Sequence, residues 1–119
     1  MPTTVTRSNP QRGEIWLVAM LRDPHSPRPC LIISENTRNQ YDTSMLVVPI
    51  FTSAPAGPTR LPLQAGQGGI RHASVLVCDQ LTTVLRDDLV HGPLGASVPI
   101  PILKAAVQAV RVAIGDPTA

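Results

Sequence analysis

The chain has 119 residues, of which 43% are hydrophobic and only 3% aromatic, so its length suits one compact domain with an aliphatic interior. No apolar stretch is long enough to span a bilayer, and the polar residues 1–9 lack the apolar centre of a secretory signal, which argues against a membrane or secreted protein. The net charge of +2 is compatible with a nucleic-acid partner, but it does not by itself indicate any class of partner. We expect a cytoplasmic protein with a flexible leader at residues 1–9 and a single domain over residues 10–119.

The first half of the chain holds three apolar segments that predict β-strands, at residues 15–20, 29–34 and 46–51. Between the first two, the turn-forming pairs Asp23-Pro24 and Ser26-Pro27 predict a loop. The polar stretch from Glu35 to Ser44 predicts a second loop, before the third strand.

The second half continues with short strands and then changes to a helical spacing. Turn-forming residues fall at 54–59, 66–69 and 90–96, and strands are predicted at 61–63, 74–78 and 81–84. From Pro99 to Ile114 the apolar residues recur every three or four positions, which predicts an amphipathic helix that ends at Gly115. The fold class is therefore mainly β: a small barrel or half-barrel of about five to seven short strands with a C-terminal α-helix.

The two cysteines, Cys30 and Cys78, each lie inside an apolar strand segment. Neither a C-x-x-C motif nor a Cys/His spacing typical of a metal site is present. We expect buried free thiols in a reducing compartment, with a structural disulfide or a metal pair as the minor alternative.

Two polar positions next to the strands point to a site. Arg28 stands directly before the strand at 29–34, and Thr52 stands directly after the strand at 46–51. If these strands are antiparallel neighbours, the start of one lies beside the end of the other, and both residues share one rim of the sheet. A guanidinium beside a hydroxyl is a binding site for an anion, most naturally a phosphate. This arrangement indicates phosphodiester chemistry without a metal.

Four segments, in order along the chain, resemble the MazF/PemK family, the toxins of bacterial toxin–antitoxin pairs. They are Arg12-Gly13-Glu14-Ile15-Trp16, Arg28-Pro29-Cys30-Leu31-Ile32-Ile33-Ser34, Val48-Pro49-Ile50-Phe51-Thr52-Ser53 and Ser74-Val75-Leu76-Val77-Cys78-Asp79-Gln80. Each motif is weak when taken singly, and the four at these intervals make a specific match. The resemblance covers nearly the whole chain from Arg12 onward.

The resemblance implies a homodimer of SH3-like barrels, a fold shared with the CcdB toxins. It further implies a metal-independent and cofactor-independent endoribonuclease that cleaves single-stranded RNA, such as messenger RNA, at a short sequence, and an antitoxin of the MazE type that blocks the RNA groove. The catalytic positions would be Arg28 and Thr52. Polar positions that line or support the RNA site would be Asn39, Ser53, Ser74 and Gln80.

The chain departs from the family pattern in the loop before Arg28. This loop usually carries a Gly-x-Glu element, whereas here it reads Asp23-Pro24-His25-Ser26-Pro27. Because the family's glutamate is missing, the sequence leaves open whether this loop contributes an acidic side chain to the site. The general base of the reaction is also left unidentified. His25, three residues before Arg28, is a candidate for the base, although the family pattern requires no histidine there.

Each singled-out residue also has a purely structural interpretation. Arg28 can form an ion pair with Glu14 or Asp79 that contributes little to stability. Thr52 and Ser53 can form an ordinary strand-ending turn, Gln80 can satisfy a loop carbonyl, and Asn39 can be a turn former. Trp16, the only tryptophan, is expected in the core or in a dimer interface.

Two other functions use the same fold. A CcdB-like protein would poison DNA gyrase by binding and would have no use for Arg28 and Thr52. A catalytically silent relative would keep the RNA groove without cleaving RNA, and the altered loop at 23–27 keeps that alternative open.

Overall fold

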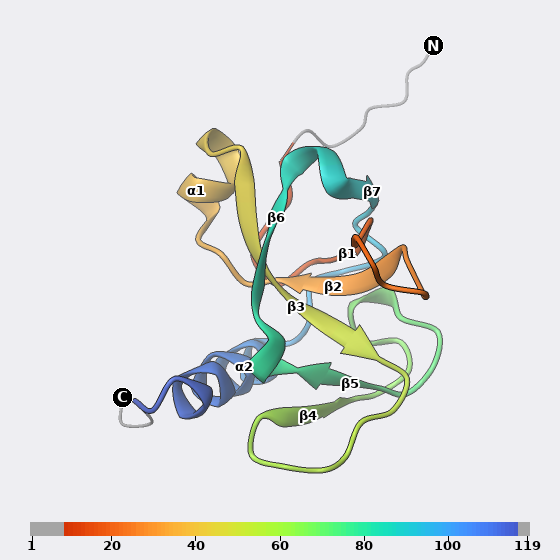
Figure 1. Ribbon diagram of the computed structural model, residues 1–119, viewed down its shortest axis with the longest axis vertical. Helices are drawn as coiled ribbons and strands as arrows, with labels where there is room; N and C mark the ends of the chain where they lie inside the picture. Colours follow the sequence, from red (N-terminus) through yellow and green to blue (C-terminus); the bar gives the residue numbers. More distant parts are fainter. Residues whose placement is uncertain (1–8, 117–119) are drawn as a thin grey trace.

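The computed structural model describes residues 9–116. The predicted leader therefore lies outside the described residues except for Asn9. The described chain contains seven short strands and two α-helices (Figure 1). The strands are β1 (Ile15–Val18), β2 (Arg28–Ile32), β3 (Ser44–Phe51), β4 (Arg60–Leu63), β5 (Ser74–Val77), β6 (Thr82–Leu85) and β7 (Leu89–His91). The helices are α1 (Asn36–Tyr41) and α2 (Ile100–Ala113), with 3₁₀ turns η1 (Gln67–Gly69), η2 (Cys78–Gln80) and η3 (Arg86–Asp88).

The strands form one antiparallel sheet in the order β4-β5-β3-β2-β1-β7, with β6 also paired to β3. The long strand β3 is the centre of the fold, because its first half pairs with β6 and its last residues pair with β5. Its pairing with β2 joins Cys30 to Pro49 and Ile32 to Val47. The predicted mainly β fold with a C-terminal helix is confirmed.

The core has two parts on opposite sides of this bent sheet. Buried aliphatic residues such as Ile15, Leu31 and Leu76 pack with the buried face of α2 in the first. The second gathers around Trp16, Val18 and other buried residues of β2 and β3. Trp16 is 6% exposed and its indole N–H donates to a Glu14 carboxylate oxygen at 3.1 Å, which confirms the core position.

Both cysteines are buried and free, as expected. Burial raises the pKa of the Cys30 thiol to about 12 and that of the Cys78 thiol to about 11. Because only the thiolate is reactive, both residues act as small apolar core residues at neutral pH.

Two predicted irregular segments contain regular structure. The predicted loop from Glu35 to Ser44 contains α1, whose first turn is capped by the Glu35 carboxylate on the Arg38 N–H at 2.9 Å. This helix has only six residues, too few to show an apolar periodicity in the sequence. Asn39 is its one buried residue. The predicted turn at 90–96 begins with the end of β7, which pairs with β1. Neither helix in residues 9–116 is long and apolar enough to cross a membrane.

Replacement of Gly69 by alanine should destabilise the fold strongly. Gly69 has a φ of +91°, and a Cβ there would lie 2.4 Å from the backbone carbonyl of Leu94. The strained backbone and the clash together predict a loss of about 2–4 kcal/mol in the free energy of unfolding, measured by urea denaturation. Gly66→Ala is the matched control, because its φ is +94° and a Cβ there would meet no atom within 4 Å. Equal losses in the two variants would show that the close approach to Leu94 contributes nothing.

Candidate functional site

Three strand ends meet at one rim of the sheet. β2 begins at Arg28, β3 ends at Phe51 just before Thr52, and β5 begins at Ser74 (Figure 1). Antiparallel pairing of β3 with both neighbours places these ends side by side. The expected proximity of Arg28 and Thr52 is therefore confirmed, and β5 adds a third polar strand end.

These ends surround a pocket of about 430 Å³. Its polar lining comes from Arg28, Thr52, Ser53, Ser74 and His25. Thr52, Ser53 and His25 are exposed, whereas Arg28 is 8% exposed and lies at the base. The pocket therefore combines a buried cation with exposed hydroxyls, which is a suitable lining for a phosphate group.

Arg28 is held in place from three directions. Its Nε and Nη2 atoms donate to the two carboxylate oxygens of Asp23 at 2.5 and 3.0 Å, and its Nη1 atom donates to the Ile50 carbonyl at 3.1 Å. The guanidinium carbon also lies 4.0 Å from the centre of the Phe51 ring. These bonds use three of the five N–H donors, so two donors remain for a ligand. The guanidinium is thus preorganised and keeps donors for an anion.

The partner of Arg28 differs from the residues that the sequence suggested. Asp23, from the loop before β2, takes the place considered for Glu14 or Asp79. Asp79 instead pairs with Arg60, and Glu14 accepts the Trp16 indole N–H. The loop that lacks the Gly-x-Glu element therefore still supplies a carboxylate to the site.

Asp23 is strongly favoured in its charged form. The hydrogen bond from Arg28, with a further bond from the His25 backbone N–H at 2.9 Å, lowers the Asp23 pKa from 3.8 to about 2. Its bond to Asp23 in turn raises the pKa of Arg28. Both groups are fully ionised at neutral pH, and the negative charge of Asp23 partly offsets the positive charge of Arg28.

A family model for the PemK-like, MazF-like toxin of type II toxin–antitoxin systems matches residues 11–114. The chain belongs to this family. The match spans every strand and both helices described above, including the strand ends that form the Arg28 pocket.

Solved structures of PemK/MazF-like proteins share the fold. An endoribonuclease from a mycobacterial species has a TM-score of 0.76 at 21% identity, covering 93% of this chain and 96% of its own. A mycobacterial endoribonuclease in complex with its cognate antitoxin has a TM-score of 0.72 at 23% identity, covering 93% and 98%. MazF from Deinococcus radiodurans has a TM-score of 0.76 at 20% identity, covering 90% and 97%.

Four of the six residues predicted for the PemK/MazF-like site lie together in the pocket: Arg28, Thr52, Ser53 and Ser74. Gln80 lies beside it, since Gln80 and Arg28 both line an adjoining hollow with Arg22 and Phe51. The predicted roles of these residues stay predictions, and the structure supplies the proximity that the roles require.

Asn39 is not brought to this group. It lies in α1, beyond the opposite end of β2 from Arg28, and its side chain is fully buried (Figure 1). Its amide donates to the Ser34 carbonyl at 2.9 Å and its oxygen accepts from the Ser34 hydroxyl at 2.5 Å. In this position Asn39 anchors α1 to the end of β2, so it can support the fold but presents no atom to a ligand in the Arg28 pocket.

Sequence reasoning missed Asp23 and Phe51 as parts of the PemK/MazF-like site. The sequence identifies Asp23 only as a turn former, because an Asp-Pro pair favours a turn whatever the Asp side chain contacts. Phe51 ends an apolar strand and gave no polar signal. The one available signal in the sequence is that Asp23 lies five residues before Arg28, because a tight loop can bring two residues at that spacing into contact.

The Asp23–Arg28 pair should make acid stability depend on Asp23. Because folding lowers the Asp23 pKa, the stabilisation is complete above pH 3.8 and is lost as the pH falls through about 2. Between these values the free energy of unfolding should fall more steeply for the unsubstituted protein than for Asp23→Asn. Urea denaturation followed by Trp16 fluorescence at a series of pH values measures both curves. Parallel curves would contradict a stabilising ion pair.

Proposed function

We propose that this protein is the toxin of a type II toxin–antitoxin pair and that it cleaves single-stranded RNA at a short sequence. The family match supports the toxin assignment. The observation that carries the activity is the preorganised Arg28 guanidinium, which meets Thr52, Ser53 and Ser74 in one pocket. Endoribonucleases among the structural neighbours are consistent with this activity.

The chemistry follows from what RNA itself supplies. The 2′-hydroxyl oxygen attacks the adjacent phosphorus, the bond to the 5′-oxygen breaks, and the products carry a 2′,3′-cyclic phosphate and a 5′-hydroxyl. Two N–H donors of Arg28 stabilise the charge that builds on the phosphate oxygens, and one of them can hydrogen-bond the leaving 5′-oxygen, which takes its proton from water. The Thr52 hydroxyl binds a phosphate oxygen or the 2′-hydroxyl and holds the attack in line.

The 2′-hydroxyl proton needs an acceptor, and we assign it to His25. Its imidazole lines the same pocket as Arg28 and Thr52, and its backbone N–H is fixed by Asp23. Asp23 itself is engaged with Arg28 through both oxygens, and Arg28 stays protonated. An unchanged cleavage rate in His25→Asn would remove His25 from this role.

The proposal includes partners of three kinds. They are single-stranded RNA such as messenger RNA, a second copy of the chain that forms a homodimer, and a cognate antitoxin of the MazE type in the same cytoplasm. Neighbouring structures of an endoribonuclease with its cognate antitoxin and of MazE–MazF support the antitoxin. Because the reaction uses the nucleophile of the RNA and the charge of Arg28, the proposal requires no metal ion and no cofactor.

The test is incubation of the purified protein with a long single-stranded RNA in excess EDTA, followed by mapping of the cut sites and product ends. Cuts at one short sequence, with 2′,3′-cyclic phosphate and 5′-hydroxyl ends, are expected. Cuts that require added Mg²⁺, or that leave 5′-phosphate ends, would contradict the proposed chemistry.

The same experiment separates the two alternative functions. RNA binding without cleavage, beside an active family member as positive control, would identify the catalytically silent alternative. Neither binding nor cleavage, together with inhibition of DNA gyrase, would identify the CcdB-like alternative.

A further inference from the structure

Besides the hollow next to Gln80, another hollow adjoins the Arg28 pocket, and it is called the second hollow below. It has a volume of about 490 Å³, which lies within the range of about 300–1,000 Å³ typical of small-molecule sites. We propose that this hollow is a subsite for a nucleotide next to the cleaved phosphate, and that Arg71 and His72 hold that nucleotide. The inference rests on the proposed endoribonuclease function and extends it to how the RNA is selected.

The two hollows are neighbours that share part of their lining. Pro29, Thr52 and Ser74 line both, so an RNA strand that passes Thr52 has the second hollow next to the Arg28 pocket. Successive nucleotides of an RNA strand occupy neighbouring positions of this kind. The shared wall therefore makes the second hollow the adjoining position on one side of the cleaved bond.

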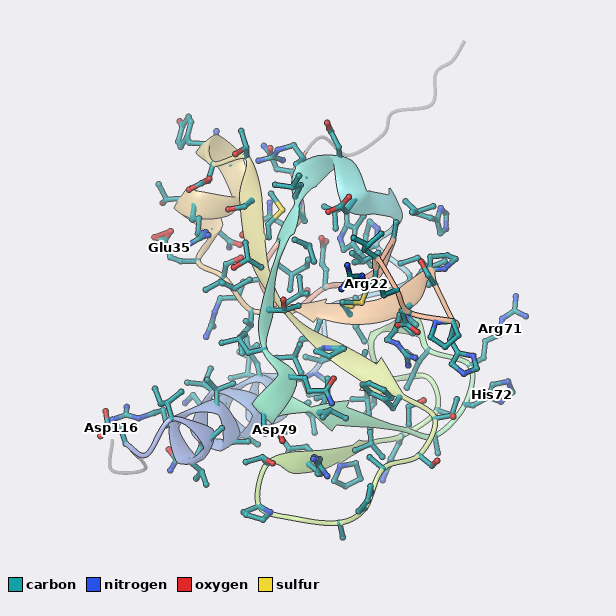
Figure 2. All side chains as sticks on the ribbon, in the orientation of Figure 1. Arg22, Glu35, Arg71, His72, Asp79 and Asp116 are labelled. Carbon is teal, nitrogen blue, oxygen red and sulfur yellow. The ribbon has the colours of Figure 1, made fainter. Side chains whose placement is uncertain are left out.

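The lining has the two chemistries that a nucleotide needs. Arg71, His72 and His91 are exposed and supply a cation and two imidazole rings. Figure 2 shows Arg71 and His72 projecting outward from the same loop. A guanidinium binds a phosphate, and imidazole and guanidinium planes stack on bases.

Apolar side chains complete the lining. Ile70 and Leu94 line the hollow and also pack against the core, and Leu17 of β1 lines it as well. Apolar surface of this kind suits the face of a base and adds no charge. Arg71 would thus bind the phosphate and His72 would stack on the base, while the apolar side chains add contact with the ring.

The loop that carries Arg71 and His72 is fixed at both ends. Before it, Ile70 is 7% exposed, and its carbonyl accepts the Gly66 N–H at 2.8 Å. After it, the Ser74 hydroxyl donates to the His72 carbonyl at 2.9 Å. Ser74 also lines the Arg28 pocket, so one residue sets the position of the loop relative to the cleavage site. A rigid loop is what selection among bases requires, because little ordering is needed on binding.

Arg71→Ala, His72→Ala and the double variant test the inference, with Arg111→Ala as the control. Arg111 lies on α2, forms an ion pair with Asp116 and lines none of the three hollows. KM and kcat are measured with a short RNA that contains the mapped cut site. Kd is measured by fluorescence anisotropy at several salt concentrations, with the same short RNA carrying a 2′-deoxyribose at the cut site, so that the nucleophile is missing and the RNA stays intact.

Each single variant should raise KM about tenfold with kcat unchanged, the effect of losing one stacking or phosphate-binding side chain. Arg71→Ala should also reduce the slope of log Kd against log salt by about 0.7, the value for one phosphate contact on a single strand. RNAs shortened by one nucleotide at a time from each end provide a further test. Once the nucleotide in the second hollow is removed, the variants and the unsubstituted protein should have equal KM values.

Three results would overturn the inference. If the unsubstituted protein neither binds nor cleaves RNA, the proposed function fails and the inference fails with it. If the unsubstituted protein cleaves RNA but the variants behave like Arg111→Ala, the inference alone fails. If the variants become monomers in sedimentation while the unsubstituted protein is a dimer, the hollow holds the second copy of the chain.

Discussion

Replacement of Arg28 by alanine should lower the rate of RNA cleavage by at least about 10²–10³-fold, the loss typical of removing a preorganised donor from developing charge. Arg28 supplies the fixed cation in the pocket, and its remaining N–H donors are the ones proposed to meet the phosphate. The measurement is the single-turnover cleavage rate in EDTA. Sedimentation should show the same oligomeric state as for the unsubstituted protein, because Arg28 serves the site rather than an interface.

Arg28→Ala also removes a partner of Asp23 and of the Ile50 carbonyl, so a folding control is needed. A destabilisation of about 1–3 kcal/mol is expected from the unpaired carbonyl of the buried Ile50. Arg28→Lys keeps the charge, but a single ammonium cannot reproduce the fork that meets both Asp23 oxygens. A folded Arg28→Lys protein should therefore also lose most activity, whereas Arg111→Ala should keep it. Full activity in folded Arg28→Ala or Arg28→Lys would refute the assignment.

Replacement of Thr52 by alanine should lower kcat by about 10–100-fold, the loss expected for one hydrogen bond to a charged group. Thr52 is exposed directly after β3 and lines both hollows, so its hydroxyl is available to the phosphate or the 2′-hydroxyl. Thr52→Ser keeps the hydroxyl and should keep a substantial part of the activity. Initial rates at saturating RNA compare the three proteins.

Thr83→Ala is the matched control for this series, because Thr83 is an exposed threonine on β6 outside both hollows. Each of these surface substitutions should change the free energy of unfolding by no more than about 0.5 kcal/mol, so differences in kcat report the site. Equal kcat values for the unsubstituted protein, Thr52→Ala and Thr52→Ser would exclude a role for the hydroxyl.

The strands of the sheet could be predicted because their signals are local. Runs such as Leu46–Ile50 are apolar and bounded by polar or turn-forming residues, which is the local signal of a strand. The same locality explains why Arg28 and Thr52 could be placed together. Once two consecutive strands are antiparallel neighbours, the positions of their ends follow from the pairing.

Short or capped elements escaped prediction because their stability comes from contacts distant in the sequence. Helix α1 shows no apolar period, and it is held by the Glu35 cap and by the buried Asn39–Ser34 hydrogen bonds. Asn39 itself has the sequence signal of an ordinary turn residue, and only the packing of α1 beside β3 shows that it is buried against Ser34. The end of β7 has the sequence signal of a turn, and only its pairing with β1 identifies it as a strand.

The sequence thus established six of the seven strands, the terminal helix and the Arg28–Thr52 juxtaposition, all of which follow from patterns over a few residues. The tertiary fold selected Asp23 as the partner of Arg28 and brought Ser74 to the same rim. It also joined His91, beside Leu17 in the β1–β7 pairing, to the loop of Arg71 and His72. The physical reason is that side chains from separate loops meet only after the sheet has closed, and no local pattern records which loops will then be neighbours.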